Sequence, residues 1–192
     1  MVTLYDGSAR EEWLAELVNA APHNRRLLLA LYAVLGIPEK HLDVGCGDGT
    51  MVRTALMLGV DAVGVDQLVE ANSQHFYHHN LVDVFDLKHG FDLVTCFEVA
   101  EHLDPSAHAS LCESLTANLA EGRGHYLVFT SAHPGQGGNG HLSERPAAYW
   151  HNEFSLRHLN FRRDLTTELA LVWSNIDTPL YWMAANVMVF EK

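Results

Sequence analysis

Residues 42–50 read Leu-Asp-Val-Gly-Cys-Gly-Asp-Gly-Thr, and this stretch decides the fold. Apolar Leu42 and Val44 are typical of the end of a buried strand. Glycine at every second position then lets the chain turn sharply into a helix, with its backbone close to a ligand. The spacing G-x-G-x-G is one residue shorter than the G-x-G-x-x-G fingerprint of dinucleotide-binding proteins. A pyrophosphate binds bare amides at a helix N-terminus, and the carboxylate of Asp43 would repel it. The turn therefore favours a ligand that offers an ammonium to Asp43 and a carboxylate to the amides.

The composition indicates a single globular domain that covers residues 1–192. The chain is long enough to bury a full core, and 48% of its residues are hydrophobic. Its formal net charge is -12, with only 12 lysines and arginines, which argues against a surface that binds nucleic acid. Such a charge suits a neutral or cationic small molecule. We expect a small-molecule acceptor, no nucleic-acid partner, and a monomer or a homodimer.

The cysteines and the apolar runs indicate a cytoplasmic protein. Cys46, Cys96 and Cys112 are odd in number and form no C-x-x-C pair, so we expect three reduced thiols. The N-terminal residues lack the apolar segment of a signal peptide. No apolar run approaches the roughly 20 residues that a membrane span requires, so we expect no membrane association.

Helical and strand patterns alternate along the chain. Apolar residues at helical spacing, together with caps and prolines, predict helices at 9–20, 23–35, 50–58, 67–75, 104–120 and 147–158. Short apolar runs predict strands at 41–44, 62–66, 76–79, 91–97, 126–130, 169–173 and 181–190. This alternation predicts an α/β fold with a doubly wound, mainly parallel sheet.

Two segments are expected to cover the ligand. Residues 132–146 are rich in glycine and polar side chains and follow a predicted strand. A loop so long and polar is either functional or disordered, and strands of an open α/β sheet end at the ligand crevice. We therefore expect 132–146 to be an active-site loop. From position alone, we expect the helical N-terminal region, residues 1–35, to form a lid over the cofactor.

Polar residues at the ends of two further strands extend the predicted site. Asp66 closes the second strand about 20 residues after the glycine turn, where an acid accepts hydrogen bonds from ribose hydroxyls. Gln67 could line the adenine side, and the amide of Asn80 could pair with the adenine edge. S-adenosylmethionine joins an adenosine to a zwitterionic amino-acid end, so it fits both halves of this site.

The chain resembles the class I S-adenosylmethionine-dependent methyltransferases over about half of its length. The matching elements are Leu42–Thr50, Val65-Asp66, Asn80-Leu81, Phe91-Asp92-Leu93-Val94 and Glu98-Val99-Ala100-Glu101-His102. The resemblance implies a Rossmann-like sheet of seven strands, the last ones antiparallel, and S-adenosylmethionine as cofactor. It implies that the cofactor binds to Asp43, Gly45, Cys46, Gly47, Asp66, Gln67, Asn80, Leu81 and Phe97. Relatives usually have Asp where this chain has Asn80, so we expect a modest weakening of adenine binding.

The segment from Phe129 to Trp150 resembles that of a bacterial and phage-type subgroup of this family. That subgroup carries Pro-Gly-Gln-Gly-Gly, then Gly-His-Val-Asn-Glu and Tyr-Trp, and here Leu142 and Ser143 replace the Val and the Asn. The resemblance indicates which residues form the site, but it does not identify the substrate. We expect the acceptor to contact Gln136, Asn139, His141, Tyr149 and Trp150. For Tyr149 and Trp150, a place in the core between helix and sheet stays an alternative.

Glu98, Glu101 and His102 follow a predicted strand, at positions that share one face of a helical turn. Two carboxylates and an imidazole suit Mg²⁺, Mn²⁺ or Zn²⁺. The spacing resembles that of ubiquinone-biosynthesis catechol methyltransferases and of enzymes that methylate the 2′-oxygen at small-RNA 3′ ends. In the latter, a later histidine completes the metal site, which here would be His141, with His133 as the alternative. Metal-free relatives keep a similar turn with local hydrogen bonds, so a site without metal stays open.

The predicted reaction is an in-line displacement at the methyl group of a sulfonium. The protein positions the acceptor and removes its proton, for which His102, His133 and Glu98 are the catalytic candidates. A bound metal could instead lower the pKa of the acceptor hydroxyl. We predict an O-methyltransferase for a sugar, a catechol or another diol. The alternatives are a small-molecule N-methyltransferase, an RNA 3′-end 2′-O-methyltransferase, which the net charge disfavours, and a cofactor-binding module without catalysis.

The remaining histidines and aromatic residues are not expected to act in catalysis. We predict a surface position for His78, His79 and His108. We predict a place in the core or at an interface for Trp173, Tyr181 and Trp182.

Overall fold

The computed structural model describes residues 8–192, and within this range it leaves out the side chains of 8–14, 17 and 18. The first residues of the predicted lid, and the apolar side chains expected on its first helix, therefore lie outside the described part. No helix in the described range has the length and apolar character needed to cross a membrane.

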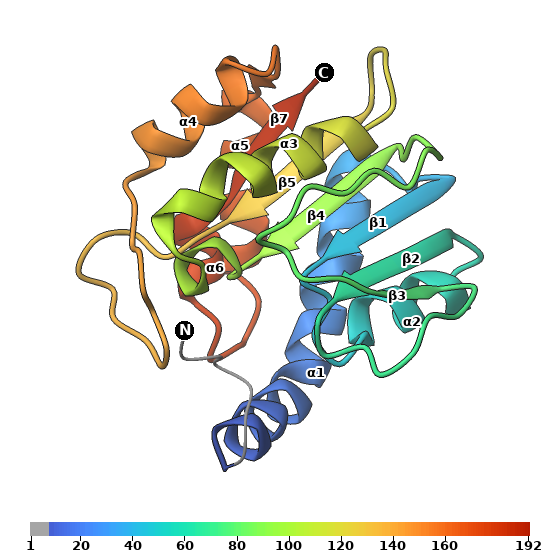
Figure 1. The fold of residues 1–192 in the computed structure, drawn as a ribbon. Coiled ribbons are helices and arrows are strands. Elements are labelled where there is room, and N and C mark those ends of the chain that lie inside the picture. Colours follow the sequence, from blue (N-terminus) through green and yellow to red (C-terminus); the bar gives the residue numbers. More distant parts are fainter. Residues whose placement is uncertain (1–7) are drawn as a thin grey trace.

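A seven-stranded sheet forms the centre of the molecule (Figure 1). Its strands, in chain order, are β1 (Lys40–Val44), β2 (Asp61–Asp66), β3 (Phe76–His78), β4 (Leu93–Phe97), β5 (Tyr126–Thr130), β6 (Asn160–Phe161) and β7 (Met188–Glu191). Their spatial order is β3-β2-β1-β4-β5-β7-β6. The first five strands are parallel, and β7 lies antiparallel to both β5 and β6. The predicted mainly parallel sheet with antiparallel last strands is confirmed.

Helices cover both faces of the sheet. They are α1 (Ser8–Leu35), α2 (Thr50–Met57), α3 (His108–Asn118), α4 (Ala147–Ser155), α5 (Arg163–Ser174) and α6 (Trp182–Asn186), with short 3₁₀ turns at Ala100–His102 and Pro105–Ala107. Helices α3 and α4 pack on one face, where Leu111, Leu115 and Phe154 are fully buried. Helices α1, α2 and α5 pack on the other, where α1 contacts both α2 and α5. The strands are therefore buried on both sides, as their nearly continuous apolar sequences require.

Two predictions about helices in the first half of the chain are wrong. The helices expected at 9–20 and 23–35 form one helix, α1, which contains Pro22. Residues 67–75 form turns and bends and not a helix. Proline removes one amide donor from a helix, but a helix can continue through it when its neighbours pack well.

The strand predicted at 169–173 is also wrong, because these residues belong to α5. Leu169 and Trp173 lie four residues apart and are both buried, which is the spacing of a helix face. The strand predicted at 181–190 is present only at its end, in β7, since α6 occupies its first half.

Candidate active site

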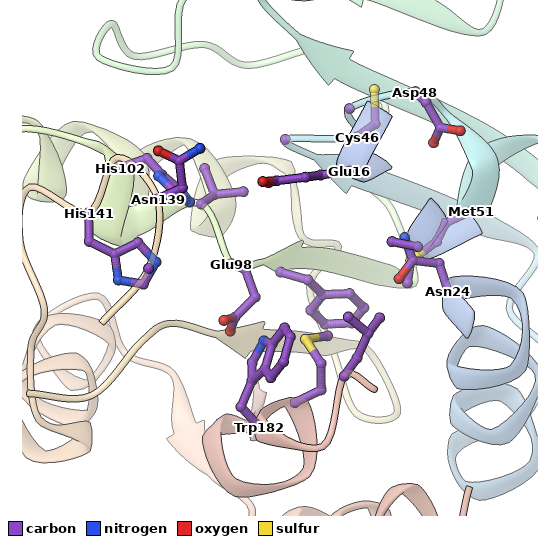
Figure 2. Close-up of a pocket in the computed structure, with 18 of the residues that line it drawn as sticks. Glu16, Asn24, Cys46, Asp48, Met51, Glu98, His102, Asn139, His141 and Trp182 are labelled. Carbon is purple, nitrogen blue, oxygen red and sulfur yellow. The ribbon is translucent and has the colours of Figure 1, made fainter. Parts of the chain in front are cut away.

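A cavity of about 880 Å³ opens at the carboxyl ends of β1, β2 and β4. Its wall comes from α1, the glycine turn, the ends of β2 and β4 with the residues that follow them, Leu81, the loop after β5, and residues 179–185. Figure 2 shows side chains from these parts pointing into one space. The position agrees with the rule that open α/β sheets bind ligands at this edge.

The glycine turn forms the cavity wall between β1 and α2. Gly45, Gly47 and Gly49 all have positive φ, at 77°, 53° and 74°, which is the backbone region that glycine adopts freely. A Cβ on Gly45 would collide with the side chain of Val99. The prediction that the glycines allow a sharp turn is confirmed by this geometry.

Two acids stand at the glycine turn. Asp66 accepts hydrogen bonds from the amides of Gly47 (2.9 Å) and Leu68 (2.8 Å), so it braces the turn as well as lining the cavity. Burial, with a smaller contribution from the nearby carboxylates of Asp66 and Asp48, raises the pKa of Asp43 to about 7. A cationic group in the cavity would relieve this crowding of negative charge.

Eight of the nine residues predicted to bind the cofactor line the cavity: Asp43, Gly45, Cys46, Gly47, Asp66, Gln67, Leu81 and Phe97. The ninth, Asn80, is exposed outside it, and its side-chain oxygen accepts a hydrogen bond from the amide of Val82 (3.4 Å). Its local role is that of a turn former, so the structure does not support contact with adenine.

Glu98 points toward Trp182 and away from the two histidines in Figure 2. Its carboxylate accepts hydrogen bonds from the side-chain amides of Asn186 (3.3 Å) and Gln136 (3.4 Å). Asn186 also donates to the Gln136 oxygen (2.9 Å). Glu98 has a positive φ of 53°, which is uncommon for a residue other than glycine and turns its side chain into the cavity. The predicted metal role of Glu98 is not supported, because it is absent from the cluster that could hold a metal among the described residues.

Glu101, His102 and His141 form that cluster, each offering a ligand atom within 4.8 Å of the others. Oε1 of the buried Glu101 accepts a hydrogen bond from the amide of Ala132 (3.2 Å). Oε2 of the same carboxylate is buried and finds no hydrogen-bond partner within the described range. Burial, reinforced by Glu98, raises the pKa of Glu101 to about 8, which a cation would reverse.

The two imidazoles of the cluster meet edge to face, with ring centres 5.0 Å apart. Burial lowers the pKa of His102 to about 4, so its ring is neutral at pH 7 and keeps a lone pair. Its Nδ1 lies 3.3 Å from the carbonyl oxygen of Gly140. Neutral imidazole is the form that binds a metal or accepts a proton.

Glu144 organises the loop that carries His141. Its carboxylate accepts hydrogen bonds from the amides of Gly135 and Gly137 (both 2.7 Å) and lies 3.0 Å from Nδ1 of His141. A proton on Nδ1 leaves Nε2 as the free lone pair of the neutral ring. Sequence reasoning missed Glu144, although a single acid within a glycine-rich loop was a usable signal.

The residues predicted to contact the acceptor separate into two groups. Gln136, Asn139 and His141 line the cavity, as does His133, a catalytic candidate. Trp150 is instead fully buried against Phe129, and Tyr149 packs on the same core. The structure therefore favours the core alternative for Tyr149 and Trp150.

One prediction about an isolated side chain is wrong. His108 is fully buried, with Nε2 3.1 Å from the carbonyl of Ala100, and is not a surface residue. Tyr181 is 76% exposed and lines the cavity, so it does not belong to the core, and its place at an interface stays a prediction. Trp182 packs against the core as predicted and also lines the cavity, and Trp173 is buried as predicted.

Sequence reasoning expected the N-terminal region near the cofactor, but it missed the individual cavity residues of α1 and the segment before α6. Glu16, Asn19 and Asn24 of α1 line the cavity, as do Pro179 and Leu180. No motif marks these residues, because only tertiary packing brings them to the site.

The comparisons with known proteins agree with this arrangement. A family model for the methyltransferase domain matches residues 9–171. The ubiquinone biosynthesis O-methyltransferase of Psychrobacter arcticus is 31% identical over 128 residues, which are 56% of this chain and 48% of the relative. The chain thus spans about half the length of the curated relatives that it matches.

Solved structures share the fold. The N-methyltransferase NodS from Bradyrhizobium japonicum, in complex with S-adenosyl-L-homocysteine, superimposes with a TM-score of 0.63 at 18% identity, over 89% of this chain and 86% of NodS. Human N-acetylserotonin methyltransferase, in complex with SAM, gives 0.61 at 13% identity, over 98% of this chain and 57% of the human chain. With the family model covering most of its length, the chain belongs to the methyltransferase domain family.

Proposed function

We propose that this protein is an S-adenosylmethionine-dependent methyltransferase that methylates a hydroxyl oxygen of a small molecule such as a sugar, a catechol or another diol. One observation carries the proposal: a single cavity joins the acid-flanked glycine turn to a carboxylate and histidines on its opposite wall. The first wall suits the amino-acid end and ribose of the cofactor, and the second suits an acceptor.

The proposed reaction needs only positioning and one proton acceptor. The acceptor oxygen attacks the methyl carbon, the carbon–sulfur bond breaks, and S-adenosylhomocysteine leaves. His102 or His133 takes the hydroxyl proton, and both side chains line the cavity. Glu98, with Gln136 and Asn139 nearby on the wall, positions the acceptor hydroxyls.

We further propose that Glu101, His102 and His141 bind a divalent metal. The donor set fits: a buried carboxylate oxygen lacks a partner within the described residues, and two imidazole nitrogens lie within reach. Two imidazoles and a single carboxylate favour Zn²⁺ or Mn²⁺ over Mg²⁺, which prefers oxygen ligands. When bound, such an ion would lower the pKa of an acceptor hydroxyl.

A small-molecule N-methyltransferase is the second candidate. Glu98 stands beside Trp182 in the cavity, and a carboxylate with an aromatic face suits an ammonium group. The sugar N-methyltransferase KedS8 shares the fold with a TM-score of 0.61, which is compatible with this reading of the site. RNA 3′-end methylation is disfavoured by the net charge of -12.

The test combines binding with turnover. S-adenosylhomocysteine binding is measured by calorimetry, and methyl transfer from labelled S-adenosylmethionine is measured across catechols, sugars and primary amines. We expect micromolar binding and labelled ether products, reduced at least tenfold by Glu98→Gln. Labelled amines with no ether would establish the second candidate, and tight binding without any product would indicate a non-catalytic cofactor-binding module.

Metal content is measured separately, by elemental analysis of wild type and of Glu101→Ala. We expect a stoichiometric divalent ion in the wild type only. Methyl transfer at full rate in metal-free protein would leave His102 or His133 as the base and reject the metal proposal.

The region 1–35 is proposed as a lid over the cofactor, supported by Glu16, Asn19 and Asn24, which bring α1 to the cavity wall. We also propose a cytoplasmic protein that is a monomer or a homodimer. Size-exclusion chromatography with light scattering decides between the two.

A further inference from the structure

Four buried polar side chains form a continuous hydrogen-bonded chain beneath the cavity. The hydroxyl of Tyr32 in α1 lies 2.8 Å from Nδ1 of His41, and Nε2 of His41 lies 2.8 Å from Oγ1 of Thr95. Thr95 then donates to Oδ1 of Asp43 at 2.7 Å. All four side chains are at most 5% exposed. The chain thus connects helix α1 to the acid that lines the cavity.

The strand register explains how these side chains meet. His41 and Asp43 are two residues apart in β1, so both project from the same face of the sheet. Thr95 in β4 is the register partner of Asp43 on the adjacent parallel strand. That face is covered by α1, which places Tyr32 directly over His41, with their ring centres 5.8 Å apart.

In the cofactor-bound state that the proposed function requires, Asp43 faces an ammonium group and is ionised, and the direction of each hydrogen bond follows from that carboxylate. Asp43 can only accept, so Thr95 uses its single proton there and must accept from Nε2–H of His41. Burial lowers the pKa of His41 to about 3, so the ring is neutral, and its Nδ1 accepts from the Tyr32 hydroxyl. Each hydrogen bond therefore has a single direction, and the hydrogen-bonded chain of side chains holds the Asp43 carboxylate in one orientation.

Packing alone does not account for this chain. Its neighbours on the same sheet face are apolar, including Leu93, Val128 and Val189. Buried polar groups contribute little stability compared with apolar residues of the same volume, and each costs free energy if its partner is lost. A chain of them that ends on a cavity residue indicates a role in the site.

We infer that Tyr32, His41 and Thr95 are positioning residues that fix the Asp43 carboxylate for the ammonium of the cofactor's amino-acid end. The inference rests on the proposed function, because it needs that cofactor in the cavity. It assigns these three residues no direct contact with the cofactor, so they act only through Asp43.

The test compares two ligands that differ at one end. S-adenosylhomocysteine has the amino-acid end, and 5′-methylthioadenosine keeps the adenosine and the sulfur but lacks it. We expect Thr95→Val to weaken S-adenosylhomocysteine binding about tenfold or more, the effect of losing a hydrogen bond to a charged group. Binding of 5′-methylthioadenosine should stay within about twofold, since Asp43 does not face that part. Thr95→Ser restores the hydroxyl and should restore the affinity.

Ser114→Ala is the matched control, because Ser114 in α3 is equally buried and its hydroxyl accepts from Phe85 N (3.0 Å) and donates to Ser110 O (2.9 Å). It should leave both affinities unchanged. If Thr95→Val does not fold, Tyr32→Phe, which removes only the far end of the chain, takes its place with a smaller selective loss. Equal losses for both ligands, or no loss for either, would overturn the inference. A wild type that binds neither ligand would instead reject the proposed function.

Discussion

At the scale of single residues, Gly45 is the position where backbone and cavity constrain the sequence most directly. Its φ of 77° is costly for any side chain, and a Cβ would also strike Val99. Gly59 has a similar φ of 83° with nothing within 4 Å of the added carbon. Substitutions at Gly45 and Gly59 therefore separate the free-energy cost of the left-handed backbone from the effect of the collision with Val99.

We expect Gly45→Ala to abolish detectable S-adenosylhomocysteine binding, because relieving the collision must move the turn that forms the cavity wall. Gly59→Ala should cost about 1 to 2 kcal/mol of stability, the usual penalty for a left-handed alanine, and leave binding intact. Calorimetry and thermal melts of both variants measure this. Equal binding by the two variants would contradict the assigned role of the turn.

Asp43 is the residue whose proton links folding to binding. The folded protein keeps this proton until about pH 7, whereas the unfolded chain releases it near the ordinary aspartate pKa of 3.8. The folded state therefore binds more protons between these pH values, so the contribution of Asp43 to stability falls as pH rises through that window. His41, whose pKa is lowered to about 3, acts in the opposite direction below pH 6.5.

We expect the difference in melting temperature between Asp43→Asn and wild type to grow in favour of the variant from pH 5 to pH 8. Binding of S-adenosylhomocysteine to the wild type should strengthen over the same range, because the ammonium needs the carboxylate form. Melting curves and calorimetry at several pH values test both trends. A pH-independent difference between variant and wild type would show that Asp43 is already ionised at pH 5.

At the scale of structural elements, the loop between β5 and α4 depends on one carboxylate. Glu144 binds Gly135, Gly137 and His141, and it is a loop residue with a side chain 19% exposed. Loops of this length without regular structure need such internal ties to keep one conformation. Glu153 in α4 is a fair comparison, since it is 17% exposed and its carboxylate binds Arg157.

We expect Glu144→Ala to increase amide hydrogen exchange across 134–142 and to weaken metal binding about 10- to 100-fold, the usual effect of removing a group that orients a histidine ligand. Glu153→Ala should change neither property. Exchange mass spectrometry and zinc titration test the prediction. Unchanged exchange in Glu144→Ala would mean that other contacts hold the loop.

Sequence patterns predicted the elements that carry long apolar runs or glycine turns. They predicted strands β1, β2 and β4 and where these strands end. Eight of the nine expected cofactor residues accordingly line the cavity. They failed where tertiary packing decides. Leu169 and Trp173 suit a strand or a helix equally well, and only their burial against α1 selects α5. The two-residue strand β6 exists only through its pairing with β7 and has no local signal.

The candidate site shows the same division. Asp43, Asp66 and Glu101 were predicted because they lie at or just beyond the carboxyl ends of strands. Glu16 and Asn24 were not, because their approach to the cavity depends on where α1 crosses the sheet. The orientation of Glu98 away from His102 depends on its positive φ, which the sequence does not reveal.

At the scale of the whole molecule, ligand binding should raise the stability of the entire fold. The cavity draws its wall from α1, the sheet and the segment before α6, so unfolding any of them destroys the site. At a hundredfold excess of ligand over its dissociation constant, the gain is about 2.7 kcal/mol. We expect S-adenosylhomocysteine to raise the melting temperature by roughly 5 to 10 °C, as measured by calorimetry. Gly45→Ala should show no such shift, and a shift there would place the ligand elsewhere.

Pro22 gives α1 two parts that differ in their attachment. After the proline, Leu27, Leu28 and Leu31 anchor the helix in the core, and before it, among the side chains that the structure describes, Glu16 and Asn19 line the cavity. A missing amide donor weakens the helix at this junction. If residues 1–35 form the proposed lid, movement of the part before Pro22 would let the spent cofactor leave. The turnover rate of such an enzyme would be limited by the opening of this helical segment, and its methyl-transfer step would be fast by comparison.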